Sequence, residues 1–137
     1  MKIKFLAAVF LSLAILTGSI TAQNDFNTFW TKFKTAVKTS NKEAVVNLSI
    51  FPIDMPYGVS SVKKTSFLQR YNEIFNGEAN AAKCFEKAKP AKVDAKNYEV
   101  YCPFKKTPND WENTPIKYYF KLTKSGWKFA GLDNINE

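Results

Sequence analysis

The first part of the chain spaces its apolar side chains with the period of a helix. Between residues 25 and 38 the apolar positions recur every three or four residues, at Phe26, Phe29, Trp30, Phe33, Ala36 and Val37. This spacing predicts an amphipathic helix over 25–38 that buries one stripe of rings, with Asn24 or Asp25 able to cap its start.

Two further helix starts are predicted from capping boxes. The capping-box spacing occurs twice, at Ser40 with Glu43 and at Ser66 with Gln69. At this spacing a hydroxyl and a side-chain carbonyl oxygen each accept a hydrogen bond from a free backbone N–H at the start of a helix. The first predicts a short helix before residue 50, and the second a helix over 66–76 that ends at Gly77. Another helical piece is expected within 78–88.

The second half of the chain changes to a period of two. Apolar and polar positions alternate over 97–104 and 116–123, and the pattern resumes at 127–129 after a tight turn. This predicts an antiparallel meander with one buried face, and a bulge or bend at Gly131. Short strands are expected at 50–53 and 57–62. This order of predicted helices and strands indicates an α+β fold in which N-terminal helices pack on a curved C-terminal antiparallel sheet.

Residues 1–22 have the pattern of a cleavable export signal. Lys2 and Lys4 precede an apolar run over 5–16, and small residues lead to a cut after Ala22. The run is shorter than the ~20 residues of a membrane-spanning helix, so we expect no integral membrane anchor. The sequence therefore predicts one domain over 23–137 that is periplasmic or secreted.

Composition excludes several kinds of chemistry. The chain has no histidine, which removes imidazole-based catalysis and the common histidine zinc sites. The formal net charge is +8, but the lysines are dispersed and arginine occurs once, at Arg70. We therefore expect no nucleic-acid partner, no metal and no cofactor.

Cys84 and Cys102 are the only two cysteines. An even count in an exported chain favours a disulfide between them. The alternative is a reactive thiol, which usually needs a nearby base such as histidine.

The order of elements resembles the nuclear transport factor 2-like superfamily, also called ketosteroid-isomerase-like. The resemblance is carried by FWTKF at 29–33, FPI at 51–53, FLQRYNEIF at 67–75 and GWKFAG at 126–131. It implies a cystatin-like cone in which a curved sheet wraps a helix, as in small exported bacterial proteins of unknown activity. The superfamily includes enzymes and non-enzymes, and no catalytic motif can be transferred residue by residue.

The leading functional hypothesis is a non-catalytic module that holds a small, partly apolar ligand in the cone. The candidate ligand-binding residues are Trp30, Phe33, Arg70, Tyr71, Tyr98 and Tyr118. Arg70 would favour a weakly acidic ligand if its head turns inward, and would otherwise form a surface pair with Glu73. In the competing interpretation the rings fill the core themselves.

Two other functions stay open. The polar loop 105–114 carries Trp111, which suggests an inhibitor, an immunity protein or another module that binds an envelope protein. A small isomerase-like or hydrolase-like enzyme is the third hypothesis.

We expect a monomer, because Lys117, Lys121 and Lys128 surround Tyr119 on the outward sheet face; a dimer through that face is the alternative.

Overall fold

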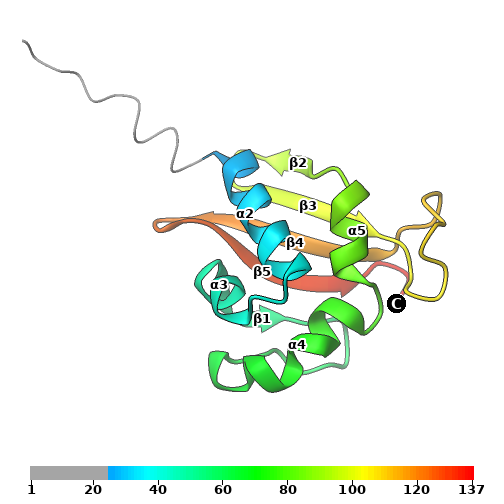
Figure 1. The fold of residues 1–137 in the computed structure, drawn as a ribbon, viewed down its shortest axis with the longest axis horizontal. Helices are drawn as coiled ribbons and strands as arrows, with labels where there is room; N and C mark the ends of the chain where they lie inside the picture. The colour runs from blue at the N-terminus through cyan, green and yellow to red at the C-terminus, as the bar shows by residue number, and fades with distance from the viewer. Residues whose placement is uncertain (1–24) are drawn as a thin grey trace, which may run out of the picture.

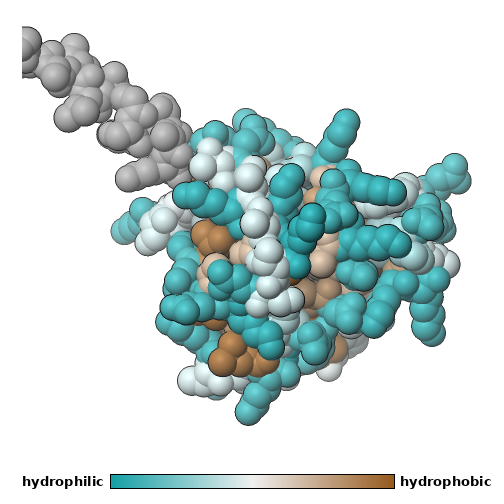
Figure 2. Space-filling model, viewed as in Figure 1, coloured by the Kyte–Doolittle hydropathy of each residue, from teal (hydrophilic) through white to brown (hydrophobic). Residues whose placement is uncertain are grey.

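A layer of helices covers one face of a twisted five-stranded sheet (Figure 1). The computed structural model describes residues 25–137, so the predicted export signal lies outside the described residues. The space-filling view of the helical side is mostly hydrophilic, with small hydrophobic patches, one of them over the lower helices (Figure 2). The α+β class and the placement of helices on one face confirm the fold predicted from the sequence.

The first described helix forms as its apolar stripe requires. Helix α2 (Phe26–Lys38) buries all six residues of the stripe, and the carboxylate of Asp25 caps it by accepting from the Asn27 N–H at 2.9 Å. Helix α3 (Lys42–Asn47) is present, but its cap differs from the prediction: Asn41 accepts from the Ala44 N–H at 3.1 Å. Ser40 instead takes a left-handed φ of 52° at the end of α2.

The second capping box is also wrong in detail. A 3₁₀ turn η1 (Lys64–Ser66) leads into α4 (Phe67–Asn76), and the Ser66 hydroxyl donates back to the Lys63 carbonyl at 3.2 Å. Ser66 is the N-cap residue of α4, but its side chain accepts no hydrogen bond from the backbone of the first turn. Helix α5 (Ala81–Lys87) follows, capped by Asn80, which accepts from the Lys83 N–H at 3.1 Å.

The sheet is mixed, because one strand from the N-terminal half joins the predicted C-terminal antiparallel sheet in parallel. The strands are β1 (Ser49–Asp54), β2 (Ala91–Asp94), β3 (Asn97–Cys102), β4 (Ile116–Thr123) and β5 (Gly126–Asn134), in the order β1-β5-β4-β3-β2. The β3–β4–β5 meander is antiparallel as predicted, but β1 pairs with β5 in parallel. Parallel neighbours need a long connection between them, which the chain from α4 to β4 supplies and which local pattern does not reveal.

Two short extended segments also differ from the prediction. Strand β2 was not expected; its four residues are all exposed, so its short alternation of apolar and polar residues does not mark a buried face. The segment 57–62 contributes a single bridge between Ile53 and Val62 rather than a strand.

A bulge interrupts β5 where it was expected. Tyr119 pairs with Gly131 and Phe120 with Phe129, so Ala130 is the extra residue. The bulge turns Phe129 and Leu132 to the buried side on either side of it.

Cys84 and Cys102 form the predicted disulfide, which joins α5 to the end of β3 with 5.8 Å between the Cα atoms. It holds the last helix against the first strand of the meander.

Candidate functional site

The rings predicted to line the cone pack against one another. Phe33 on α2 is fully buried, with ring centroids 5.2 Å from Phe120 and 5.3 Å from Phe129. Trp30 and Tyr118 both meet Phe85 edge-on, at 5.0 and 5.1 Å. These contacts give each ring a packing role that accounts for its burial. The ligand-binding role of Trp30, Phe33 and Tyr118 stays a prediction.

The two other candidate tyrosines also pack against rings of this core. Tyr98 stacks on Phe26 at 3.9 Å. Tyr71 is 4% exposed, and within residues 25–137 its buried hydroxyl has no hydrogen-bond partner. Tyr71, on α4, joins the same core through Phe75, whose ring centroid lies 4.8 Å from that of Tyr71 and 6.1 Å from that of Phe33.

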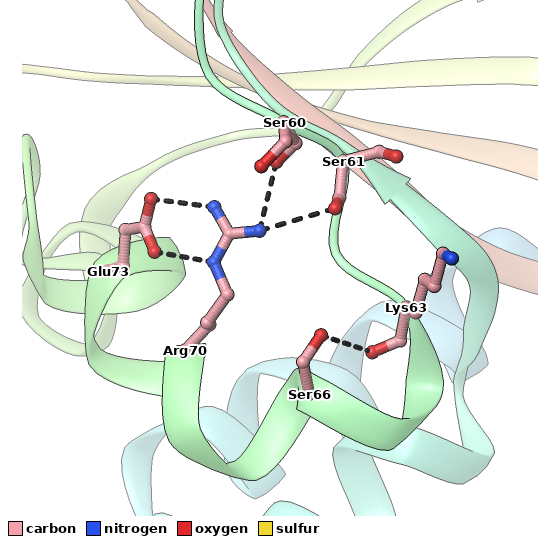
Figure 3. Close-up of polar contacts among 6 residues, drawn as sticks. All are labelled: Ser60, Ser61, Lys63, Ser66, Arg70 and Glu73. Atoms are coloured by element: carbon pink, nitrogen blue, oxygen red, sulfur yellow. Dashed lines mark hydrogen bonds and ion pairs between the residues drawn. The ribbon is translucent and has the colours of Figure 1, made fainter.

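Arg70 uses its head group to hold its own chain (Figure 3). Its Nε and Nη2 atoms donate to the two carboxylate oxygens of Glu73, both at 2.8 Å, which lowers the pKa of Glu73. Its Nη1 atom donates to the carbonyls of Ser60 and Ser61, at 2.9 and 3.2 Å. Arg70 thus ties the 57–62 segment to α4, and the surface pair with Glu73 is the arrangement that forms.

A surface groove of about 850 Å³ lies where the α4–α5 turn meets the loop after β3. We call it the Phe104 groove; it is lined by Gly77, Glu78, Phe104, Lys105, Lys106 and Thr107. The loop is fixed to the helical turn by the Lys105 N–H, which donates to the Glu78 carbonyl at 2.7 Å, and by the Lys105 ammonium, which donates to the Asn76 carbonyl at 3.1 Å. Two segments far apart in sequence therefore form one wall.

The carboxyl group of Glu78 has an unusual environment within this groove. Its Oε2 atom is buried and has no hydrogen-bond partner in the described part of the chain. Burial raises the pKa of Glu78, and the negative charges of Glu137 and Asp133 raise it further, while a hydrogen bond with Asn134 opposes them. The group can therefore accept a hydrogen bond or, when protonated, donate one.

The sequence showed no signal for Glu78. Phe104 was visible as the last apolar residue of an alternating run, but its position beside a helical turn depends on the fold. Burial of one carboxylate oxygen is a property of the packed structure alone.

The loop after the groove carries Trp111. Successive turns shape the loop, with backbone bonds from Thr107 to Phe104 at 3.0 Å and from Asp110 to Thr107 at 3.0 Å. Trp111 is 37% exposed. Its role as an interaction anchor stays a prediction.

The outward sheet face holds a pair that the sequence did not indicate. The Tyr119 hydroxyl donates to the Asp54 carboxylate at 2.8 Å, and burial and this bond raise the pKa of Tyr119. The Lys117 and Lys121 ammonium groups both lie 5.8 Å from the Tyr119 ring centre. The tyrosine crosses Gly131 to reach Asp54: a Cβ atom there would lie 2.6 Å from its hydroxyl.

Residues 25–137 contain no group of three or more acidic or cysteine side chains placed to hold a metal ion. In the same residues no helix is long and apolar enough to cross a membrane.

Comparison with known proteins shows that this chain resembles solved structures in its fold. No protein-family model and no curated protein sequence matches the chain. The fold is similar to that of nuclear transport factor 2-like proteins. One is a protein of unknown function in nutrient uptake from Rhodospirillum rubrum, with 10% identity, 80% of this chain and 95% of that chain covered, and a TM-score of 0.45.

Two further solved structures are similar. A protein with a cystatin-like fold from Novosphingobium aromaticivorans has 10% identity, covers 84% of this chain and 81% of its own, and has a TM-score of 0.45. A putative ketosteroid isomerase from Shewanella frigidimarina has 7% identity, coverages of 77% and 90%, and a TM-score of 0.43. At these identities the likeness concerns fold and transfers no activity.

Proposed function

We propose that this protein is an exported, non-catalytic module that binds a small, partly apolar ligand in the Phe104 groove. The observation that supports the proposal is an 850 Å³ groove lined by Phe104 and Glu78, whose buried Oε2 atom has no hydrogen-bond partner among the residues that the structure describes. A ligand with an apolar body and a weakly acidic hydroxyl fits this chemistry.

The apolar part of such a ligand would lie on Phe104, which is only half-buried. Its hydroxyl would donate to Glu78. A buried polar atom without a partner costs about 1–3 kcal/mol, and a ligand that supplies the missing bond recovers this cost on binding. Lys106 is exposed at the rim, where its charge favours a ligand with acidic character.

The cysteine pair supports export. A disulfide between Cys84 and Cys102 is the form expected in an oxidising compartment. Together with the signal-like residues 1–22, it favours a periplasmic or secreted protein.

The experiment is a titration of the oxidised protein with small probes, followed by amide chemical shifts. Alkylphenols and the corresponding alkylbenzenes differ only in the hydroxyl, and both are tested. We expect alkylphenols to shift the amide signals of Glu78 and Lys105, and alkylbenzenes to bind more weakly.

Three variants make the test specific. Glu78→Met keeps the length of the side chain but removes both oxygens, and should weaken alkylphenol binding about tenfold, because a hydrogen bond to a charged group contributes about 1.5–3 kcal/mol. Phe104→Ala should weaken both probe classes. Glu112→Gln, which changes an exposed acid of the same loop, is the matched control and should bind as the wild type does. Equal binding by wild type and Glu78→Met would contradict the proposal.

A second candidate function is binding of an envelope protein through the loop 105–114. Partial exposure of Trp111 favours it, because tryptophans on loops are frequent interface anchors. In this case Trp111→Ala should abolish capture of a partner that the wild type retains, while probe binding in the Phe104 groove is unchanged. Retention of the same partner by Trp111→Ala would exclude this function for the loop.

A further inference from the structure

A second cavity lies among the helices, away from the Phe104 groove. It has a volume of about 260 Å³ and lies where the end of α2, the last turns of α4 and the start of α5 meet. We call it the Tyr71 cavity; its lining is Val37, Ser40, Tyr71, Asn72, Phe75, Asn76, Asn80 and Ala82.

The Tyr71 hydroxyl is the first sign that the cavity takes a ligand. The residue is 4% exposed, and its hydroxyl has no hydrogen-bond partner among residues 25–137. Burial raises the pKa of Tyr71, so the phenol is neutral and can both donate and accept. Buried hydroxyls are normally paired, and a ligand that bonds this one would relieve the cost of leaving it unpaired.

The polar groups around the cavity are amides and hydroxyls. Asn72 and Asn76 are four residues apart on α4 and therefore share one face of that helix. Asn80 uses its carbonyl oxygen to cap α5, which leaves its NH₂ group to donate elsewhere. In the described part of the chain, the residues that line this cavity carry no formal charge.

Ser40 adds a backbone feature. It has a φ of 52°, in the left-handed region that glycine usually occupies at the end of a helix. Its N–H bonds the Val37 carbonyl at 3.1 Å, and the Asn41 N–H bonds the Ala36 carbonyl at 2.9 Å, which hold the turn in place. A serine here, rather than glycine, adds a hydroxyl to the cavity lining at some cost in backbone strain.

We propose that the Tyr71 cavity binds a neutral polyhydroxylated ligand, namely a monosaccharide or the terminal sugar of a glycan. Sugar hydroxyls both donate and accept, as do amides and phenols, so the two sets match without any charge. The volume lies below the ~300–1,000 Å³ of pockets for drug-sized ligands, which fits one sugar ring. Lys42 lies 5.1 Å from the centre of the Tyr71 ring and is not among the lining residues.

The test uses the oxidised protein labelled with ¹⁵N at asparagine, because the side-chain NH₂ signals report directly on the cavity. The probes are glucose, mannose, galactose and N-acetylglucosamine, with sodium acetate and hexanol as charged and apolar comparisons. We expect at least one sugar to shift the NH₂ signals of Asn72, Asn76 and Asn80 in a saturable way. Acetate and hexanol should leave them unchanged.

Variants then test whether the Tyr71 hydroxyl contributes to sugar binding. Tyr71→Phe should weaken sugar binding about fivefold, the equivalent of one neutral hydrogen bond, and should keep a dispersed spectrum because no protein partner is lost. Asn76→Ala should also weaken it, and Tyr57→Phe, at a site 92% exposed, should have no effect. The proposal is overturned if no sugar shifts the three NH₂ signals, if acetate shifts them equally, or if Tyr71→Phe binds as tightly as the wild type.

Discussion

The Tyr118 hydroxyl offers a sharp test of how the helices are attached to the sheet. Tyr118 on β4 is fully buried, and its hydroxyl donates to the Ile74 carbonyl of α4 at 2.9 Å. Helix α4 ends at Asn76, so Ile74 is among the last four residues, whose carbonyls lack helical partners. The tyrosine therefore satisfies the end of a helix from a strand 44 residues away.

Tyr118→Phe should lower the free energy of unfolding by about 1–2 kcal/mol. The ring and its contacts with Phe85 stay, but a buried carbonyl loses its partner, which costs about 1–3 kcal/mol. For a domain of this size the expected fall in Tm is about 4–8 °C. Urea unfolding of the oxidised protein at neutral pH, with calorimetry, measures both quantities.

Tyr71→Phe is the matched comparison, since it deletes a buried hydroxyl that has no partner among the described residues. Its free energy of unfolding should be equal to or slightly above that of the wild type. If the interior bound a ligand through Tyr118, as the sequence predicts, Tyr118→Phe would instead weaken ligand binding with little loss of stability. Equal stability of the Tyr118→Phe and Tyr71→Phe variants would refute the reasoning.

Three further predictions concern other contacts. Folding raises the pKa of Glu78, so ionisation of this carboxyl group opposes folding. The free energy of unfolding of the wild type should therefore fall as the pH rises above the ordinary pKa of a carboxyl group. Glu78→Gln should lack this fall when both proteins are unfolded with urea at a series of pH values. Reduction of the Cys84–Cys102 disulfide should cost about 3 kcal/mol, measured by unfolding with and without reductant; unchanged stability would argue against a constraining role. Gly131→Ala should lower Tm, since the new Cβ would lie 2.6 Å from the Tyr119 hydroxyl, and an unaltered Tm would show that the ring moves freely.

The sequence alone was sufficient for the features that depend on neighbouring residues. The apolar stripe of α2 appears as a period of 3–4 residues because one face of a helix meets the core, and all six predicted residues are buried. The meander appears as a period of two for the equivalent reason in strands. The disulfide followed from the presence of only two cysteines in a chain with a signal-like start.

Only the tertiary structure decided the features that depend on distant partners. The parallel pairing of β1 with β5 brings together segments from the two halves of the domain, and the Tyr119–Asp54 bond spans 65 residues. The periodicity around Arg70 is the same whether its guanidinium turns inward or binds Glu73, Ser60 and Ser61.

The two candidate sites are also features that only the tertiary structure decided. Glu78 and Tyr71 are ordinary residues in the sequence, and they stand out because packing buried one oxygen of each without a hydrogen-bond partner. Burial and hydrogen-bond satisfaction are set by every element around an atom, and a local pattern describes only the element on which that atom lies.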